Sequence, residues 1–163
     1  MVTINVAYTA PINPAGATPV LTVDWSSLAH KIHNPSSFVP VIASTRVISE
    51  STEDSIPVVT REVTFKEGFR QQGATVQEVC KSYEPTRVDF YQPDGSRISN
   101  IVSTAGDGQL YLTYDFSWQV ADDVERGSEK EARLRKEREE AAKSAVEKSV
   151  EVMRAMAGKE GGS

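Results

Sequence analysis

Alternation of apolar and polar residues predicts a β-strand over residues 110–120. One face of this strand carries Leu110, Leu112, Tyr114, Phe116 and Trp118, and the other carries Tyr111, Thr113, Asp115 and Ser117. The Gly106-Asp107-Gly108 segment before it suits a tight turn, because glycine adopts positive φ at little cost. Residues 99–104 precede that turn, so the pattern predicts a hairpin with one apolar face.

Five further segments are rich in Val, Ile and Thr, as strands usually are. They cover residues 2–7, 40–49, 57–66, 75–83 and 87–91. Polar residues 49–55 are expected to form a loop, and Pro93-Asp94-Gly95 a tight turn. The chain is therefore expected to form a curved antiparallel sheet of about seven strands.

A helical period replaces the alternation after the first strand. Apolar side chains recur at Trp25, Leu28, Ala29 and Ile32, with Thr22 and Asp24 suited to the first turn. Asn34-Pro35 is expected to end this helix and to begin a second, shorter one. Two short helices are thus predicted between the first two strands.

A long helix is predicted near the C-terminus. Ser128 and Glu131 have the spacing of a capping box at its start. The apolar stripe emerges only in its second half, at Leu134, Ala142, Ala145, Val146, Ser149, Val152, Met153 and Met156. We expect that half to pack on the sheet, Gly158 to follow the helix, and residues 159–163 to form a flexible tail after one domain of residues 1–158.

Composition restricts the possible functions of this 163-residue chain. Its net charge of −5 argues against a surface that binds nucleic acid. No apolar run approaches the roughly eighteen residues of a membrane span, and the N-terminus does not resemble a secretory signal. The single cysteine, Cys80, is expected to be a buried, inert thiol, and the expected location is cytoplasmic.

The sequence contains no pattern typical of a cofactor or metal site. His30 and His33 lie three residues apart, but no further ligands complete a metal-binding arrangement. A glycine-rich phosphate loop and a Ser-His-Asp order are both missing from the sequence. We therefore expect neither a cofactor nor a metal.

Three segments resemble one protein superfamily. They are Asn34-Pro-Ser-Ser-Phe-Val-Pro-Val-Ile42, Thr60-Arg-Glu-Val-Thr-Phe65, and the hairpin Asn100-Ile-Val-Ser103 with Leu110-Tyr-Leu-Thr-Tyr114. Together with the element order they resemble the START and birch-pollen-allergen-like (SRPBCC) superfamily, and more narrowly a fungal and bacterial branch known only as a domain of unknown function. The resemblance implies an α+β helix-grip fold, in which the sheet wraps around the C-terminal helix and encloses a hydrophobic cavity.

The resemblance also implies a range of functions, because relatives bind lipids, sterols, polyketides or plant hormones, and some catalyse cyclisations, dehydrations or condensations. No catalytic motif of an enzymatic branch maps onto this sequence. A fold that serves so many functions does not by itself select one.

Strand parity selects the candidate ligand-binding residues. On the last strand it selects Leu112, Tyr114, Phe116 and Trp118, although the aromatic side chains could simply be core. Arg61 shares a face with Val59 and Val63, where it could meet an anionic ligand or extend to solvent at the sheet rim. Asn100 shares a face with Val102 and could bind a ligand carbonyl or stabilise a turn or bulge.

The leading hypothesis is intracellular binding of a hydrophobic small molecule, such as a polyketide- or terpenoid-like metabolite, with acidic ligands preferred through Arg61. The alternative is a cofactor-independent cyclase, isomerase or dehydratase, in which Arg61, Tyr114 or Asn100 stabilises developing charge. A helix that docks a partner protein fits less well, because heptad repeats are missing. The ligand's identity and the oligomeric state stay open.

Overall fold

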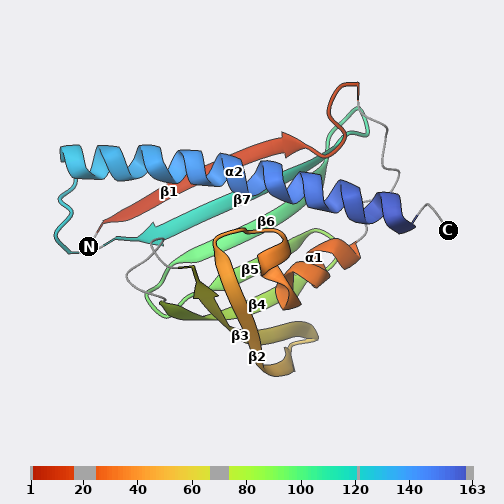
Figure 1. Ribbon diagram of the computed structural model, residues 1–163, viewed down its shortest axis with the longest axis horizontal. Helices are drawn as coiled ribbons and strands as arrows, with labels where there is room; N and C mark the ends of the chain where they lie inside the picture. Colours follow the sequence, from red (N-terminus) through yellow and green to blue (C-terminus); the bar gives the residue numbers. More distant parts are fainter. Residues whose placement is uncertain (1, 17–24, 67–73, 121, 161–163) are drawn as a thin grey trace.

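The computed structural model describes residues 2–16, 25–66, 74–120 and 122–160. Its seven strands form one antiparallel sheet in the order β1-β7-β6-β5-β4-β3-β2 (Figure 1). The strands are β1 Thr3–Pro11, β2 Ile42–Glu53, β3 Ile56–Phe65, β4 Thr75–Tyr83, β5 Arg87–Tyr91, β6 Arg97–Thr104 and β7 Leu110–Gln119. The helices are α1 Trp25–His33, the 3-10 helix η1 Pro35–Ser37, and α2 Glu129–Glu160. The predicted α+β fold is confirmed.

Strand β2 is longer than the sequence predicted. Residues 49–55 were expected to form a loop, but β2 continues to Glu53 and pairs with β3 up to Ile56. Asp54 and Ser55 form the connection with φ values of 47° and 68°, and positive φ at both positions is typical of a two-residue hairpin turn. The prediction was wrong because most of β2 is exposed, so no buried face imposes apolar alternation.

Strand β1 also extends beyond the predicted residues 2–7. It pairs with β7 along its whole length, from Thr3 opposite Gln119 to Pro11 opposite Tyr111. Pro11 is tolerated because β1 is an edge strand, where a missing N–H need not weaken the sheet. The proposed helix cap at Thr22 and Asp24 lies outside the described residues.

Two separate hydrophobic clusters cover one face of the sheet. The first joins α2 to β1 and β7, and the second joins α1 to β3, β4 and β5. Side chains of β6 touch both clusters, at Ile98 and Val102. Both helices therefore lie on the same face of the sheet, α2 over β1 and β7 and α1 over β3 to β5 (Figure 1).

Ser128 caps α2 as predicted, because its Oγ accepts the Glu131 N–H at 3.1 Å. The Glu131 carboxylate accepts the N–H of Gly127 at 2.6 Å, one residue earlier than in a standard capping box. The helix runs to Glu160, so the prediction that Gly158 follows its last turn was wrong. Gly158 is exposed, and glycine there costs only about 1 kcal/mol of helix stability.

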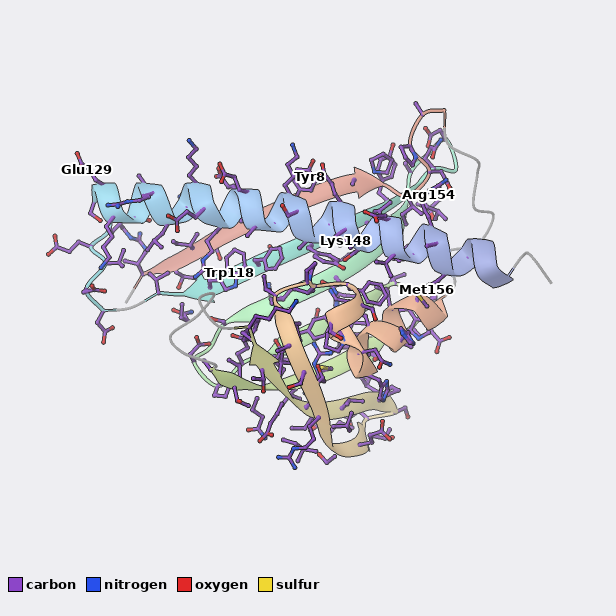
Figure 2. The ribbon with its side chains drawn as sticks, in the orientation of Figure 1. Tyr8, Trp118, Glu129, Lys148, Arg154 and Met156 are labelled. Carbon is purple, nitrogen blue, oxygen red and sulfur yellow. The ribbon has the colours of Figure 1, made fainter. Side chains whose placement is uncertain are left out.

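Polar contacts fix α2 along β1 in addition to the apolar stripe. Tyr8 Oη donates to Glu147 at 3.1 Å, and Arg154 Nη1 donates to the Ile12 carbonyl at 2.9 Å (Figure 2). The buried face of the helix contains Ala142, Val146, Ser149 and Met153, as the late stripe predicted, and also Val150, which the stripe did not include. No helix within the described ranges is both long and apolar enough to cross a membrane.

Substitution of Leu112 tests which face of β7 is buried. Leu112 is 0% exposed in the cluster beneath α2, so Leu112→Asp should lower the free energy of unfolding by at least about 3 kcal/mol. Thr113→Asp, on the opposite face of the same strand, should lower it by less than about 1 kcal/mol. Urea unfolding measures both, and equal losses would contradict the assigned faces.

Removal of the Ser128 cap should weaken only the start of α2. Ser128→Ala leaves the Glu131 N–H without its acceptor and should cost about 1 kcal/mol. Hydrogen exchange should become faster in the first two turns and stay unchanged near Met153. Ser128→Asp, which can still cap, should keep the protection, and uniform loss along the helix in Ser128→Ala would count against a local cap.

Candidate functional site

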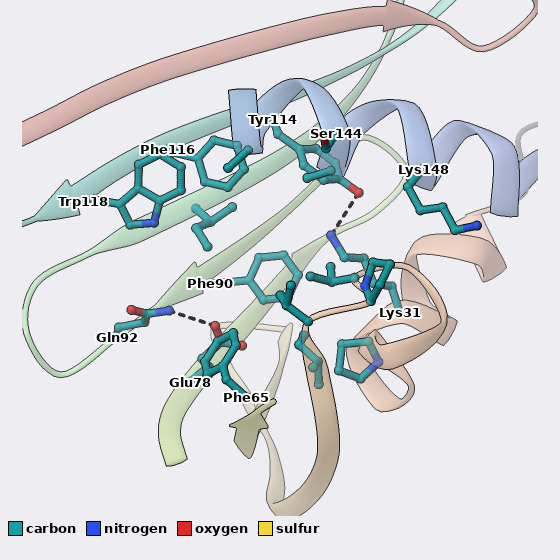
Figure 3. Close-up of a pocket in the computed structure, with 18 of the residues that line it drawn as sticks. Lys31, Phe65, Glu78, Phe90, Gln92, Tyr114, Phe116, Trp118, Ser144 and Lys148 are labelled. Carbon is teal, nitrogen blue, oxygen red and sulfur yellow. Dashed lines mark hydrogen bonds between the residues drawn. The ribbon is translucent and has the colours of Figure 1, made fainter. Parts of the chain in front are cut away.

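A cavity of about 440 Å³ lies between the two hydrophobic clusters. Its floor is the sheet from β3 to β7, and its sides are α1 with η1 and the middle of α2 (Figure 3). Val39, Pro40 and Val41, which connect η1 to β2, also line it. Because α1 and α2 cover different strands, neither fills the space between them.

Aromatic side chains of β7 form much of the apolar wall. Phe116 and Trp118 are stacked, with ring centroids 4.3 Å apart, and Tyr114 meets Phe116 edge-on at 6.1 Å. Ile98 of β6 and Ala145 of α2 continue the apolar surface. The Arg138 guanidinium lies 4.9 Å from the Trp118 ring, which gives the cavity a cationic margin at α2.

Lys31 contributes a buried amine to the cavity wall. It is only 5% exposed, and its Nζ donates to Tyr114 Oη at 2.9 Å, which donates in turn to Ser149 Oγ at 2.5 Å. Nζ also lies 4.1 Å from the centroid of the Tyr114 ring. Burial, and secondarily the charge of Arg61, lower the pKa of Lys31 to about 7.

Burial also affects the tyrosine to which this amine donates. It raises the pKa of the Tyr114 hydroxyl, while the bond to Ser149 acts weakly in the other direction. Tyr114 therefore stays protonated at neutral pH and can donate and accept a hydrogen bond together. The arrangement connects α1, β7 and α2 through three polar side chains inside an apolar space.

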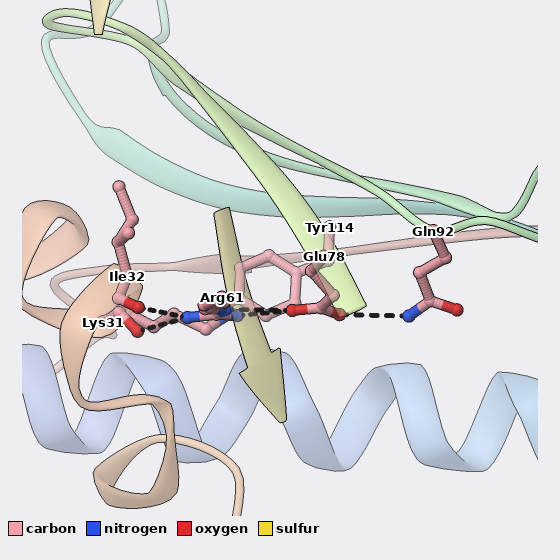
Figure 4. Close-up of polar contacts among 6 residues, drawn as sticks. All are labelled: Lys31, Ile32, Arg61, Glu78, Gln92 and Tyr114. Carbon is pink, nitrogen blue, oxygen red and sulfur yellow. Dashed lines mark hydrogen bonds and ion pairs between the residues drawn. The ribbon is translucent and has the colours of Figure 1, made fainter. Parts of the chain in front are cut away.

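A second polar group surrounds Arg61, which is 3% exposed (Figure 4). Its Nε and Nη2 donate to one oxygen of Glu78 at 3.0 and 2.7 Å. Its Nη1 donates to the backbone carbonyls of Lys31 and Ile32 at 3.0 and 2.5 Å. Gln92 Nε2 donates to the other Glu78 oxygen at 3.0 Å. Arg61 therefore binds the last turn of α1 and is balanced by Glu78.

The structure brings four of the six predicted site residues to the cavity wall: Arg61, Tyr114, Phe116 and Trp118. Of the two interpretations of Arg61, extension to solvent at the rim is wrong, because the side chain is buried and paired. Leu112 and Asn100 lie on the same sheet face, fully buried but outside the cavity lining. Their contact with a ligand stays a prediction.

Asn100 is neither in a turn nor at a bulge. It lies in β6, opposite Val88 on one side and Tyr114 on the other. Neither of its side-chain polar atoms has a hydrogen-bond partner among the described residues. A buried amide without partners is costly.

Sequence reasoning missed Lys31, Glu78, Gln92 and Ser149 as parts of one site. Lys31 follows Leu28 by three residues, so the helical period already placed it beside the apolar face of α1. Glu78 lies directly opposite Arg61 in the β3–β4 ladder. Arg61 and Glu78 carry opposite charges on the apolar faces of two successive strands, and this was the available signal. That the two side chains pair can be recognised only from the register of β3 and β4.

The remaining chemical candidates have ordinary roles. Cys80 is fully buried, as predicted, and burial raises the pKa of its thiol to about 12, so the thiol stays protonated at neutral pH. His33 Nε2 bonds to Glu50 at 2.7 Å on the surface. No group of three metal-ligating side chains occurs in the described part of the chain.

The seven-stranded sheet, the long C-terminal helix and the cavity between them define a helix-grip protein. The chain belongs to the acetylaranotin biosynthesis cluster protein L (AtaL) family, which it matches over residues 6–161. The expected resemblance to the helix-grip superfamily is thereby confirmed. Among curated proteins, none matches the sequence of the chain.

Solved structures of low sequence identity share the fold. The Zhui aromatase/cyclase from Streptomyces sp. R1128 is 17% identical, with a TM-score of 0.61 over 93% of this chain and 94% of that one. The di-domain aromatase/cyclase StfQ of the steffimycin pathway is 13% identical, with a TM-score of 0.66 over 99% of this chain and 53% of its own. The 18 kDa protein CC1736 from Caulobacter crescentus is 14% identical, with a TM-score of 0.63 over both entire chains.

The buried amine predicts a pH-dependent stability. Between pH 7 and 10.5 the unfolded chain holds the Lys31 proton and the folded chain releases it, so stability rises with pH there by up to about 1.4 kcal/mol per unit. Below pH 7 both states hold the proton, and this contribution no longer changes with pH.

The variant Lys31→Met has no amine at this position and therefore lacks the pH-dependent contribution to the free energy of unfolding. Urea unfolding from about pH 6 to about pH 9.5 should show wild type gaining stability relative to Lys31→Met as pH rises. Lys148→Met, at the cavity margin on α2, should keep the wild-type slope. Parallel profiles for wild type and Lys31→Met would contradict a lowered pKa at Lys31.

Proposed function

We propose that this protein binds a hydrophobic small molecule in the cavity between α1, α2 and the sheet. The observation that carries the proposal is the cavity wall, which is mainly apolar and aromatic and has a few buried polar groups at one side. Ligand sites usually have volumes of roughly 300–1,000 Å³ and this mixture of surfaces. At about 440 Å³ the cavity suits a molecule of two or three fused rings.

The chemistry of the wall favours a planar ligand with polar substituents. The stacked Phe116 and Trp118 rings present flat apolar surfaces, on which an aromatic ligand can pack. On the polar side, Lys31 can donate a hydrogen bond, and the buried Gln92 Oε1 has no partner among the described residues. A polyketide- or terpenoid-like metabolite with oxygen substituents matches both surfaces.

The comparisons support this class of ligand. The family is named after a protein of the acetylaranotin biosynthesis cluster, and two proteins with the same fold are aromatase/cyclases. We therefore propose a role in secondary metabolism, within the cytoplasm, with the small molecule as the partner. The charge of Arg61 is balanced by Glu78, so we assign the contact with an acidic or carbonyl-bearing ligand to Lys31 instead.

A second candidate function is a cofactor-independent cyclase, isomerase or dehydratase. The hydrogen-bonded Lys31 and Tyr114 side chains favour it, because a group that titrates near neutral pH can both take and return a proton. Turnover of cell extracts by the purified protein would distinguish catalysis from binding. A ligand that is retained unchanged, seen by native mass spectrometry, would favour the binding function.

Filling the cavity should prevent binding. Ala145 lines it from α2, so Ala145→Phe should weaken the binding of an environment-sensitive hydrophobic dye by about tenfold or more. Ala155→Phe adds the same side chain on an exposed position of α2 and should bind the dye as wild type does. Both variants should melt cooperatively. Equal dye affinity in folded Ala145→Phe and wild type would contradict the proposed site.

A further inference from the structure

We propose that the Lys31 amine forms an imine with an aldehyde or ketone carbonyl of a ligand held in the cavity. This inference rests on the proposed binding function and adds a covalent step at one named atom. It also narrows the ligand to molecules that carry a carbonyl beside an apolar ring system.

The first support is position. Lys31 lines the cavity, and its Nζ lies between the Tyr114 hydroxyl and the Phe90 ring, whose centroid is 5.5 Å away (Figure 3). A ligand that packs on the aromatic wall therefore brings its substituents within reach of this nitrogen. The backbone that carries Lys31 is held by Arg61, so the amine is directed into the cavity from a fixed turn.

The second support is the kind of group that the Lys31 amine contacts. Nζ donates to a neutral hydroxyl, while the nearby carboxylate of Glu78 is engaged by Arg61 and Gln92. A carboxylate bonded directly to Nζ would hold it as an ammonium ion, which has no lone pair for attack. A cation close by acts in the opposite direction, and Arg61 supplies one.

The charged and titratable groups that act on this amine come from three strands of the sheet. They are Arg61 of β3, Glu78 and Cys80 of β4, and Tyr114 of β7. Arg61 and burial lower the pKa of the amine to about 7, although Glu78 and Cys80 act to raise it. The amine is therefore free in a larger fraction of the molecules at neutral pH than the amine of an exposed lysine, which is almost entirely protonated.

The chemical step is balanced without an oxidant or cofactor. The nitrogen lone pair forms a bond to the carbonyl carbon, and the carbonyl oxygen takes up the two amine protons and leaves as water. The Tyr114 hydroxyl, 2.9 Å from Nζ, is placed to pass a proton from nitrogen to oxygen. Ser149, which accepts from Tyr114, holds that hydroxyl in place. The products are the protein-bound imine and one water.

Reductive trapping tests the proposal. The full-length protein is incubated with naphthaldehyde and sodium cyanoborohydride near pH 7, and the naphthylmethyl group is located by peptide mass mapping. We expect Lys31 to be modified at least about tenfold faster than any other lysine, because of its larger free-amine fraction. Lys31→Met and Lys31→Arg should lose this modification, and Lys143→Met, at an exposed position of α2 outside the cavity lining, should keep it.

Methylnaphthalene separates this proposal from the binding function, because it fits the same cavity but has no carbonyl. It should displace the hydrophobic dye and slow the modification of Lys31. Displacement by methylnaphthalene without any Lys31 adduct would overturn the imine proposal and leave the binding function standing. Adducts spread over exposed lysines, at rates that methylnaphthalene does not change, would also overturn it. Failure of both molecules to displace the dye would overturn both proposals.

Discussion

The structure around the cavity depends on one buried interaction, the pairing of Arg61 with Glu78. A guanidinium in an apolar interior must have its donors satisfied, and Glu78 takes two of them. The remaining bonds go to the carbonyls of Lys31 and Ile32, at the end of α1, where helical carbonyls otherwise lack partners. The sheet thereby holds α1 at a set distance, and the Lys31 side chain extends from that turn toward Tyr114.

The cavity follows from how the two helices divide the sheet. Helix α2 packs on β1 and β7, where the apolar side of β7 faces its late stripe, and α1 packs on β3, β4 and β5. The space between them is bounded by aromatic rings and by the connection after η1 rather than by a third helix. Burial in that space destabilises the charged form of Lys31, and its pKa is therefore lowered.

Strong local signals made much of the fold predictable. Ser128 marked the start of α2, and the alternation over β7 placed Tyr114, Phe116 and Trp118 on the cavity wall. The end of β2 was missed because an exposed edge strand carries no apolar pattern. Lys31 was missed because periodicity counts apolar positions, and the partner of Arg61 depends on the register of β3 and β4. Cavity size depends on the separation of two helices, which no local pattern encodes.

A crystal structure with a brominated naphthol tests most directly whether the space between α1 and α2 is a ligand site. The anomalous signal of bromine locates the molecule without reference to its shape. We predict one bromine position within the cavity, with the ring beside Phe116 and the hydroxyl directed to Lys31. Bromine found only on the outer surface, for example beside the exposed Val47 and Ile48 of β2, would contradict this account.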